Sequence, residues 1–457
     1  MKKIDFEYER SQLVQLKECF ADPLLEVMNI LNEIVLDHPE AISFAPGRPL
    51  ETHFQVEESL AALHHFVTVA AGESGLDEKR VWRDLGQYNR TNGTINELIS
   101  KQLALDEDIQ VPPEAIIVTV GAQEAMAIVL AGLFEPARDI LLASDPTYIG
   151  ITGLAKILGI RVLPVSAGDN GVEPEAVEQA ISSCRSVGTP RALYDIPDFN
   201  NPLGTSLSLD RRLRLLEICH KNDILLIEDN PYGMFNYSGE KLPTLKALDK
   251  HATVIYIGSF SKTIFPGLRL GYLVADQHVE HGKHLLAKEL SKVKSLITVN
   301  TSPLLQAIVG GILLKNNGSL QPVVRSKVGI LKRNRDVMLE CLAKHFRGSS
   351  ERVQWNHPNG GFFLTMKLPF PFGQDELKRC ACDYGVIVCP MRFFTLGQDR
   401  ECQIRLSFSY VDEEQIDEGV NRLAHFINDR SSVRGMRPAS SCHAQSSVPE
   451  SAGRKEK

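Results

Sequence analysis

Short apolar runs alternate with longer amphipathic stretches along the chain from about residue 118 onward. Runs that are rich in β-branched residues and bounded by turn formers predict strands. Because these runs are apolar at nearly every position, the strands are expected to be buried on both faces, as in a parallel sheet. The predicted strands are residues 140–143, 161–165, 192–196, 224–229, 254–260 and 269–275. The alternation predicts an α/β fold with a mainly parallel sheet between helices.

One amphipathic stretch, SLDRRLRLLEICHKND, lies between two predicted strands and is typical of a crossover helix. Ser208 can cap its start, because a serine hydroxyl accepts a hydrogen bond from a free backbone amide of the first turn. Leu209, Leu213 and Leu216 recur at helical spacing and predict the buried stripe. We expect this helix to support the sheet and to carry no chemistry.

The C-terminal part of the chain has a different order of elements. A helix at 330–345 leads to a turn and a strand, and a helix over Gln374–Tyr384 precedes strands at 386–389 and 403–409. This order predicts a smaller α+β domain. After residue 429 the chain is rich in Ser, Pro and charge, which predicts a disordered tail. The predicted divisions are an N-terminal segment that joins the small domain (1–75), a large domain (76–315), a small domain (316–430) and the tail (431–457).

Composition and charge narrow the class of protein. Of the 457 residues, 43% are hydrophobic and 23% are charged, which excludes a wholly disordered chain. The net charge of -7 offers no basic surface, so no nucleic-acid partner is expected. The longest apolar window, residues 115–134, is interrupted by Gln123 and Glu124, and the N-terminus does not read as a secretory signal. We therefore predict a cytoplasmic protein without a membrane span.

The cysteines do not predict a metal site. Nine are scattered along the chain without the paired CxxC spacing of a zinc site. A single alanine separates Cys380 from Cys382, which is too short a spacer for a tetrahedral clamp. Reduced and mostly buried thiols, and no metal, are expected.

Four segments carry candidate chemistry, and their order is more informative than any one of them. They are GAQEAM from Gly121, FNNPLG around Asn201, IEDNPYG around Asp229 and GSFSKTIFPGLRLGY around Lys262. With APGRP, HPNGGFF and IRLSFS, this set resembles the class I/II aminotransferases, which are pyridoxal-phosphate (PLP) enzymes of fold type I in the aspartate aminotransferase superfamily. The resemblance covers residues 42–427 and is strongest to the kynurenine/2-aminoadipate type. It implies a PLP cofactor, a large cofactor-binding domain and a smaller α+β domain.

Lys262 is the candidate catalytic residue. An aldehyde cofactor needs an amine to hold it as a Schiff base, and a lysine with a depressed pKa can release it and then move a proton. The resemblance implies that the cofactor phosphate is bound by Ser259, Ser261 and Arg269, the last with its rigid fork of donors. Lys262 is then left free for the aldehyde.

The resemblance also assigns contacts to the cofactor ring. Asp229 would face the pyridine nitrogen and raise its pKa, so that the ring can accept electrons. The D-x-x-Y spacing to Tyr232 favours Asp229 over the adjacent Glu228. Asn201 and Tyr232 would share the phenolic oxygen, with a plain Asn-Pro turn as the alternative reading of Asn201. Tyr148 would stack on the ring, with a core tyrosine as its alternative.

The remaining contacts concern the phosphate, the substrate and a second subunit. Backbone amides of Gly121, Ala122 and Gln123, at a helix start, would complete the phosphate site. By resemblance, Arg405 grips the substrate α-carboxylate, helped by Asn201, and Gly47 lines the substrate pocket. Tyr88 resembles a tyrosine that reaches the phosphate of the neighbouring subunit, which implies a homodimer with shared active sites.

The chain departs from the family pattern after the strand at 386–389. It has Pro390-Met391-Arg392-Phe393 where the family commonly has PGxxF. Met391 is expected to add bulk near the substrate arginine. Arg392 either binds a distal acidic group or faces water, and the second is the commoner fate of an arginine.

The predicted function is transfer of an amino group from an α-amino acid to an α-keto acid with ping-pong kinetics. Other PLP reactions, namely β- or γ-elimination or replacement, racemisation and amino acid oxidation, use the same residues and stay open. A ligand-sensing domain without catalysis is a third hypothesis, but it requires a DNA-binding module, and the segment before residue 42 is too short and too acidic for one. The amino donor, the amino acceptor and the pathway are not specified by these motifs.

Overall fold

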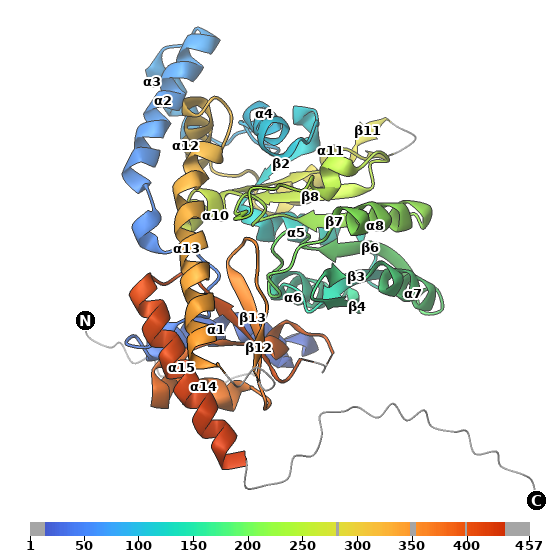
Figure 1. Ribbon diagram of the computed structural model, residues 1–457. Helices are drawn as coiled ribbons and strands as arrows, with labels where there is room; N and C mark the ends of the chain where they lie inside the picture. The colour runs from blue at the N-terminus through green and yellow to red at the C-terminus, as the bar shows by residue number, and fades with distance from the viewer. Residues whose placement is uncertain (1–13, 280–282, 348–352, 398–399, 435–457) are drawn as a thin grey trace, which may run out of the picture.

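The computed structural model describes residues 14–279, 283–347, 353–397 and 400–434 (Figure 1). Its largest sheet consists of β2 (Ile116–Thr119), β3 (Asp139–Asp145), β4 (Arg161–Gly168), β5 (Gly171–Val172), β6 (Thr189–Asp195), β7 (Leu225–Asp229), β8 (Val254–Ser259) and β9 (Gly271–Val274). Their order is β2-β9-β8-β7-β6-β3-β4-β5. The pairs from β8 through to β4 are parallel, whereas β9 is antiparallel to both its neighbours and β5 to β4.

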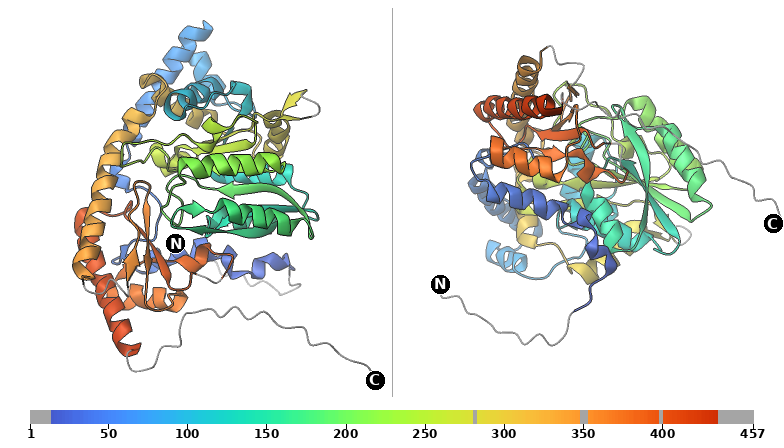
Figure 2. Two further views of the ribbon diagram at one scale, coloured as in Figure 1. Left: turned by 45° about the vertical axis from the view of Figure 1, so that its right-hand side comes forward. Right: turned by 90° about the horizontal axis from the view of Figure 1, so that it is seen from below.

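Helices cover the two faces of this sheet. α5 (Gly121–Leu133) packs against β8, β9, α6 (Ile149–Ile157) and α11 (Leu286–Ile297). α7 (Pro174–Cys184) and α8 (Leu209–Lys221) pack against each other and against β4 and β7. Strands lie between helices in both views of Figure 2. The predicted α/β fold with a mainly parallel sheet is confirmed.

All six predicted strands are present, with small differences at their ends. The strand predicted at 254–260 ends one residue earlier, because Phe260 begins α10 (Phe260–Thr263). The strand predicted at 269–275 is the shorter β9, and it runs antiparallel. Arg269 lies outside it with a left-handed backbone, φ 48°, which no strand residue adopts. This turn directs the Arg269 side chain toward Ser261, where Nη1 donates to the hydroxyl at 3.3 Å.

Helix α8 starts where the sequence predicts but buries a different face. Ser208 caps it and accepts a hydrogen bond from a first-turn amide. Leu209 and Leu213 are exposed, so the predicted stripe is wrong. The buried positions are Arg212, Leu215, Ile218 and Cys219. Arg212 occupies a core position because its guanidinium forms an ion pair with Asp198 at 2.5 Å, a partner that apolar spacing does not reveal.

A second sheet forms the core of the smaller α+β part. It consists of β12 (Gln354–Trp355), β13 (Phe363–Lys367), β16 (Gln403–Ser407) and β15 (Cys389–Pro390), in that order and antiparallel. α14 (Gln374–Tyr384) agrees with the prediction, whereas α13 (Gln321–His345) begins earlier than the predicted residue 330. The strand predicted at 386–389 is divided into β15 and β14 (Val386–Ile387), which pairs with β1 (Ile42–Ser43).

The N-terminal segment contacts both parts of the protein. β1 pairs with β14, and α1 (Val27–Asp37) precedes it. α2 (Val56–Ser74) instead packs along α12 (Pro303–Lys315) and against α3 (Glu78–Leu85). The other elements are α4 (Asn96–Glu107), α9 (Leu245–Leu248), β10 (His278–Val279) and β11 (His284–Leu285). The boundaries of the predicted domains stay a prediction.

The last helix, α15 (Glu413–Arg434), crosses α13, as Figure 1 shows. It extends four residues into the tail that the sequence predicts from residue 431, and the rest of that tail lies outside the described residues. Within the described ranges, no helix combines the length and the apolar character that a membrane span requires.

The parallel strands bring chemically useful residues to one edge of the large sheet. β3, β6, β7 and β8 end at Asp145, Asp195, Asp229 and Ser259. Because parallel strands share a direction, these ends lie side by side. Ligands of open α/β sheets bind at this edge, outside the carboxyl ends of the strands.

Candidate active site

A cavity of about 620 Å³ lies at this edge of the sheet. Its walls come from the ends of the large-sheet strands, from α1 and the segment after β1, and from the small sheet. The structure brings most of the predicted site residues together here, namely Gly47, Ala122, Gln123, Tyr148, Asn201, Asp229, Tyr232, Ser259, Ser261, Lys262, Arg269 and Arg405. Gly121 lies directly behind this wall. Tyr88 does not reach the cavity of its own chain.

Lys262 lies on the short helix α10 at the end of β8, and its amine points into the cavity. Nζ donates a hydrogen bond to the Gly47 carbonyl at 2.7 Å. The pKa of Lys262 is lowered to about 8, mainly by burial and also by the positive charges of Arg269, Arg48 and Arg405. A substantial fraction of this amine is therefore neutral near pH 8, as a nucleophile or a proton acceptor requires.

Asp229 lies at the end of β7, and its two carboxylate oxygens have different surroundings. Tyr194 donates its hydroxyl to Oδ2 at 2.7 Å. Oδ1 is buried and has no hydrogen-bond partner among the described residues. Burial raises the pKa of Asp229 to about 6, although the bond from Tyr194 opposes this shift. A buried carboxylate oxygen without a partner at a cavity wall is suited to a cationic N–H of a ligand.

Ser259, Ser261 and Arg269 form a cup at the end of β8. The Ser261 amide donates to Ser259 Oγ at 3.2 Å, and Arg269 Nη1 donates to Ser261 Oγ. The start of α5 closes the cup on the other side, where first-turn amides have no acceptor within their helix. Gly121 has a φ of 75°, and a Cβ there would lie 2.6 Å from Arg269 Nη2, so another residue would be strained and would displace the guanidinium. Hydroxyls, a guanidinium and helix amides together favour a phosphate.

Arg405, on β16, lies on the opposite wall and is almost fully buried. Nη1 donates to Asn201 Oδ1 at 2.7 Å, and Nη2 donates to the Ala45 carbonyl at 2.5 Å. The guanidinium lies between the rings of Phe363 and Phe394, with Cζ 4.2 and 4.6 Å from their centroids. Nε has no partner, and no carboxylate of the described residues forms an ion pair with this cation. A planar anion such as a carboxylate would complete it.

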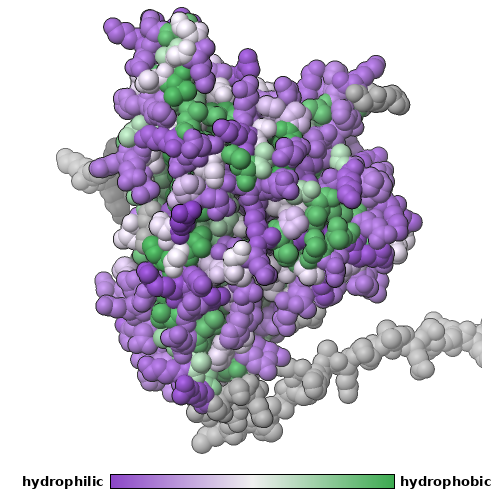
Figure 3. All heavy atoms as spheres, turned by 45° about the horizontal axis from the view of Figure 1, so that its top comes forward, coloured by the Kyte–Doolittle hydropathy of each residue, from purple (hydrophilic) through white to green (hydrophobic). Residues whose placement is uncertain are grey.

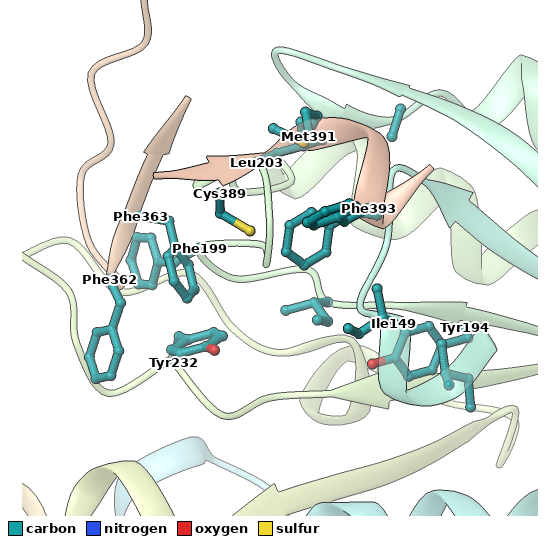
Figure 4. Close-up of a cluster of buried hydrophobic side chains, with 14 of the residues drawn as sticks. Ile149, Tyr194, Phe199, Leu203, Tyr232, Phe362, Phe363, Cys389, Met391 and Phe393 are labelled. Carbon is teal, nitrogen blue, oxygen red and sulfur yellow. The ribbon is translucent and has the colours of Figure 1, made fainter. Parts of the chain in front are cut away.

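Asn201 connects Arg405 to Tyr232, the residue predicted to share the phenolic oxygen of the cofactor ring with it. Its Nδ2 donates to the Tyr232 hydroxyl at 3.5 Å, while its Oδ1 is held by Arg405. Tyr232 packs edge-on against Phe362 and Phe363 at 5.2 and 5.6 Å, as in the cluster drawn in Figure 4. Its ring is thereby fixed and its hydroxyl is directed to the cavity, the position that the D-x-x-Y spacing predicts.

Tyr148 and Tyr88 have different environments. Tyr148 lines the cavity and donates to Gln123 Oε1 at 3.2 Å, and burial raises its pKa to about 12. It is therefore placed to contact a bound ring while neutral. Tyr88 is 78% exposed. The predicted contact of Tyr88 with the phosphate of a neighbouring subunit stays a prediction.

The two residues that depart from the family pattern both lie outside the cavity wall. Met391 is fully buried and belongs to the apolar cluster in Figure 4. Arg392 is exposed. Phe394, two positions further on, lines the cavity and covers Arg405 instead. The bulk expected beside Arg405 is thus provided by Phe394, which no motif in the sequence indicates.

Several residues of the site were missed from the sequence. Tyr194 could have been found, because Tyr194 pairs with Ile227 and Asp229 is two residues further, hence on the same face. Arg48 could have been suspected from its place beside Gly47. The wall that α1 contributes gave no local signal, since its residues are ordinary apolar positions of an amphipathic helix: Met28, Leu31, Val35 and Leu36.

These features fit PLP. The cup at Arg269 suits its phosphate, the free Oδ1 of Asp229 suits the N–H of a protonated pyridine ring, and the Lys262 amine suits its aldehyde. The fold and the cavity therefore define a PLP-dependent enzyme of fold type I.

The chain belongs to the aminotransferase class I and II family, whose profile matches residues 74–423. It is 45% identical over 410 residues to (S)-3,5-dihydroxyphenylglycine transaminase of Amycolatopsis orientalis, covering 90% of this chain and 93% of that one. It is 31% identical over 392 residues to 2-aminoadipate transaminase of Thermus thermophilus, covering 85% and 90%. Among solved structures it is similar to a kynurenine aminotransferase of Pyrococcus horikoshii, with a TM-score of 0.76, 28% identity and coverage of 89% and 94%. The predicted aminotransferase identity, PLP cofactor and relation to the kynurenine/2-aminoadipate type are confirmed.

Proposed function

We propose that this aminotransferase takes its amino group from an α-amino acid with an aromatic or other large apolar side chain and passes it to a 2-oxo acid by a ping-pong mechanism. The observation that carries the proposal is the position of Arg405, a buried cation that lies in the same cavity as Lys262 and forms no ion pair with a carboxylate of the described residues. An α-carboxylate bound there leaves the side chain of the donor to face the rest of the wall.

The apolar part of that wall supports the choice of donor. α1 contributes Met28, Leu31 and Val35, and α6 contributes Ile149. Such a wall gains free energy from burying an aryl or large aliphatic group and cannot pair with a charged one. The similarity to a transaminase of (S)-3,5-dihydroxyphenylglycine supports an aryl-bearing donor. The similarity to a 2-aminoadipate transaminase makes an acidic donor the alternative to be tested.

We assign the following roles to the residues of this chain. When bound, PLP supplies a sink for the electron pair left at the substrate Cα. Lys262 Nζ takes the proton from Cα, and its lowered pKa favours this transfer near neutral pH. Arg405 fixes the α-carboxylate and so orients the Cα–H bond, while Asp229 holds the ring nitrogen in its protonated form. Phe363 and Phe394 exclude water from Arg405, which strengthens its contact with an anion.

The donor preference is tested with the holoenzyme and a panel of amines. L-phenylglycine and L-phenylalanine are expected to exceed L-aspartate and L-2-aminoadipate in kcat/KM by about tenfold or more, the value of burying one large apolar side chain. Benzylamine, which lacks the carboxylate, serves as the matched control and is expected to be at least about tenfold poorer than L-phenylglycine. Equal rates with the acidic donors, or with benzylamine, would contradict the proposal.

We infer further that the enzyme acts as a homodimer in which each active site receives Tyr88 from the other subunit. The exposure of Tyr88 supports this, as does an exposed apolar group on and after α11, namely Leu296, Ile297, Val299 and Leu304. Hydrophilic side chains cover most of the face in Figure 3, and apolar side chains are exposed there only in separate patches. The predicted cytoplasmic location stays a prediction.

Mixing two inactive variants tests the shared site. Lys262→Ala and Tyr88→Ala are purified separately, partly unfolded together and refolded. If Tyr88 acts across the interface, half of the dimers carry one intact site, and activity returns to about a quarter of that of the wild type. If Tyr88 acts within its own chain, or not at all, mixing gives no gain. Light scattering on the same sample reports whether dimers have formed.

A further inference from the structure

Phe394 covers one face of the Arg405 guanidinium, and its position depends on the backbone that carries it. Phe363, on the other face, belongs to β13 and is fixed by its pairing with β16, the strand that also carries Arg405. Phe394 instead ends the 3₁₀ helix η6 (Met391–Phe394) and belongs to no strand. The contacts of residues 394–397 therefore decide whether this ring stays on the guanidinium.

Hydrogen bonds from the end of β3 and the turn after it hold residues 394–397. The Thr147 amide donates to the Phe394 carbonyl at 2.9 Å. The amides of Leu396 and Gly397 donate to the two oxygens of the Asp145 carboxylate, at 3.0 and 3.2 Å. Hydrogen bonds to a carboxylate are about twice as strong as bonds between neutral groups. Asp145 therefore makes the main contribution to holding this segment.

Asp145 lies behind the cavity wall and not in it. It does not line the cavity, whereas Tyr148 and Ile149, a few residues further along the same turn, do. Asp145 thus joins the carboxyl end of a large-sheet strand to the segment that carries Phe394. Any effect of Asp145 on a ligand must pass through the residues that it holds.

The cover that Phe394 provides bears directly on how strongly Arg405 binds an anion. A guanidinium between two rings is shielded from water, and charges attract each other more strongly where water is excluded. An ion pair in contact with water contributes little. If residues 394–397 were released, the ring could leave Arg405, and water would reach the face that it covers.

We propose that Asp145 is a positioning residue for the substrate α-carboxylate: it holds residues 394–397, keeps Phe394 on Arg405 and so raises the affinity of Arg405 for a carboxylate. This inference rests on the proposed function, because it takes Arg405 as the site of the α-carboxylate. Loss of Asp145 is expected to weaken the binding of carboxylates while the chemistry at Lys262 is retained.

The first test measures the binding of an unreactive carboxylate to the holoenzyme. 3-Phenylpropanoate has an aryl group and a carboxylate but no amine, so it can occupy the cavity without reacting. An asparagine accepts through one atom only, so Asp145→Asn loses one of the two bonds and the charge. The Kd of 3-phenylpropanoate, measured by titration calorimetry, is expected to rise about tenfold.

Two controls accompany this measurement. 3-Phenylpropanamide has the same shape without the charge and is expected to bind equally to the wild type and to Asp145→Asn. Asp210→Asn removes the same charge from an exposed position in the first turn of α8. This variant is expected to bind 3-phenylpropanoate like the wild type.

A double variant shows whether Asp145 acts through Phe394. Phe394→Ala alone is expected to raise the Kd of 3-phenylpropanoate about tenfold. Because the ring is then absent, adding Asp145→Asn is expected to change Kd by less than about twofold. A general structural defect would instead multiply with the effect of Phe394→Ala.

Steady-state kinetics of Asp145→Asn gives an independent readout. KM for L-phenylglycine is expected to rise while kcat changes little, because the contact with the carboxylate is made before and during the reaction alike. Turnover of benzylamine, which has no carboxylate, is expected to stay at the wild-type level. Retained benzylamine turnover also shows that the variant is folded.

Four results would overturn the inference: an unchanged Kd in Asp145→Asn, an equal loss with 3-phenylpropanamide, independent effects in the double variant, or an equal loss of benzylamine turnover. The comparison of Kd values does not depend on the donor class. If the donor panel fails while Kd still depends on Asp145 and Phe394, the donor class is wrong and the positioning role stands. If the panel succeeds and Kd is unchanged, only the inference fails.

Discussion

Replacement of Lys262 by alanine is expected to lower kcat by about two to four orders of magnitude, because no other amine lines the cavity among the described residues to move the Cα proton. The variant is expected to fold, since Lys262 makes one hydrogen bond, to the Gly47 carbonyl, and no ion pair within the described part of the chain. Borohydride treatment of the holoenzyme followed by peptide mapping is expected to fix the cofactor on Lys262 in the wild type and to give no label in Lys262→Ala.

The chain carries an internal control for this experiment. Burial lowers the pKa of Lys327 to about 8 as well. Its Nζ, however, donates to the carbonyls of Thr263 and Ile264 at 2.7 and 2.6 Å, and it lies outside the cavity. A lowered pKa alone therefore does not identify the lysine that binds the cofactor, and Lys327 is expected to stay unlabelled. Label at Lys327, or turnover by Lys262→Ala close to that of the wild type, would refute the assignment.

The pH dependence of cofactor capture gives a further readout of Lys262. The neutral amine reacts with an aldehyde, and its fraction rises with pH through the pKa. With a pKa of about 8, capture by the apoenzyme is expected to be half-maximal near pH 8 and to level off above it. An amine with the ordinary value of 10.5 would still be gaining reactivity at pH 10.

Asp229→Asn is the second substitution with a large expected effect. It replaces a buried anion by a neutral amide and so breaks the expected pair between Asp229 and the ring nitrogen. Breaking a buried pair costs about 3–5 kcal/mol, so kcat/KM is expected to fall by about two to four orders of magnitude. Tyr194→Phe keeps the carboxylate but removes the hydrogen bond to Oδ2, and is expected to give a smaller loss of about 1.5–3 kcal/mol in the same direction. Steady-state kinetics of both variants, with cofactor absorbance to show loading, measures the two effects.

Glu228→Gln is the matched control for Asp229→Asn. In the sequence, only the D-x-x-Y spacing favours Asp229 over the adjacent Glu228 as the ring contact. Glu228 is buried but points away from the cavity, and its oxygens accept from the amides of Leu245 and Lys246 at 2.9 and 2.7 Å. Its replacement is expected to lower the free energy of unfolding by about 1–3 kcal/mol while the loaded enzyme retains its kcat. A loss of kcat in Glu228→Gln as large as in Asp229→Asn would show that the effect of Asp229→Asn comes from a disturbed structure and not from a lost contact with the ring nitrogen.

The sequence predicts the large sheet and the residues at its carboxyl ends well, because strand ends and motif spacings are local features. Lys262, Asp229 and Arg269 each lie inside the short motif that identifies them, at the end of a strand or in an adjoining turn. The sequence predicts contacts between distant segments poorly. Arg405 meets Asn201 and Ala45 across 204 and 360 residues of chain, and nothing in the spacing of any one segment specifies those partners. The prediction of the buried face of α8 is wrong for the same reason, because Arg212 is buried through its ion pair with the distant Asp198.

The wall that α1 contributes to the cavity has a consequence for how this enzyme can diversify. The residues proposed to hold the cofactor and to move protons lie at, or just after, the ends of the large-sheet strands. The proposed carboxylate contact, Arg405, lies on β16, whereas much of the apolar surface expected to meet the donor side chain comes from one early helix. Substitutions in that helix can alter which amines are accepted without disturbing the reaction centre. We therefore expect donor selectivity to differ between relatives that keep the same reaction but differ in this helix.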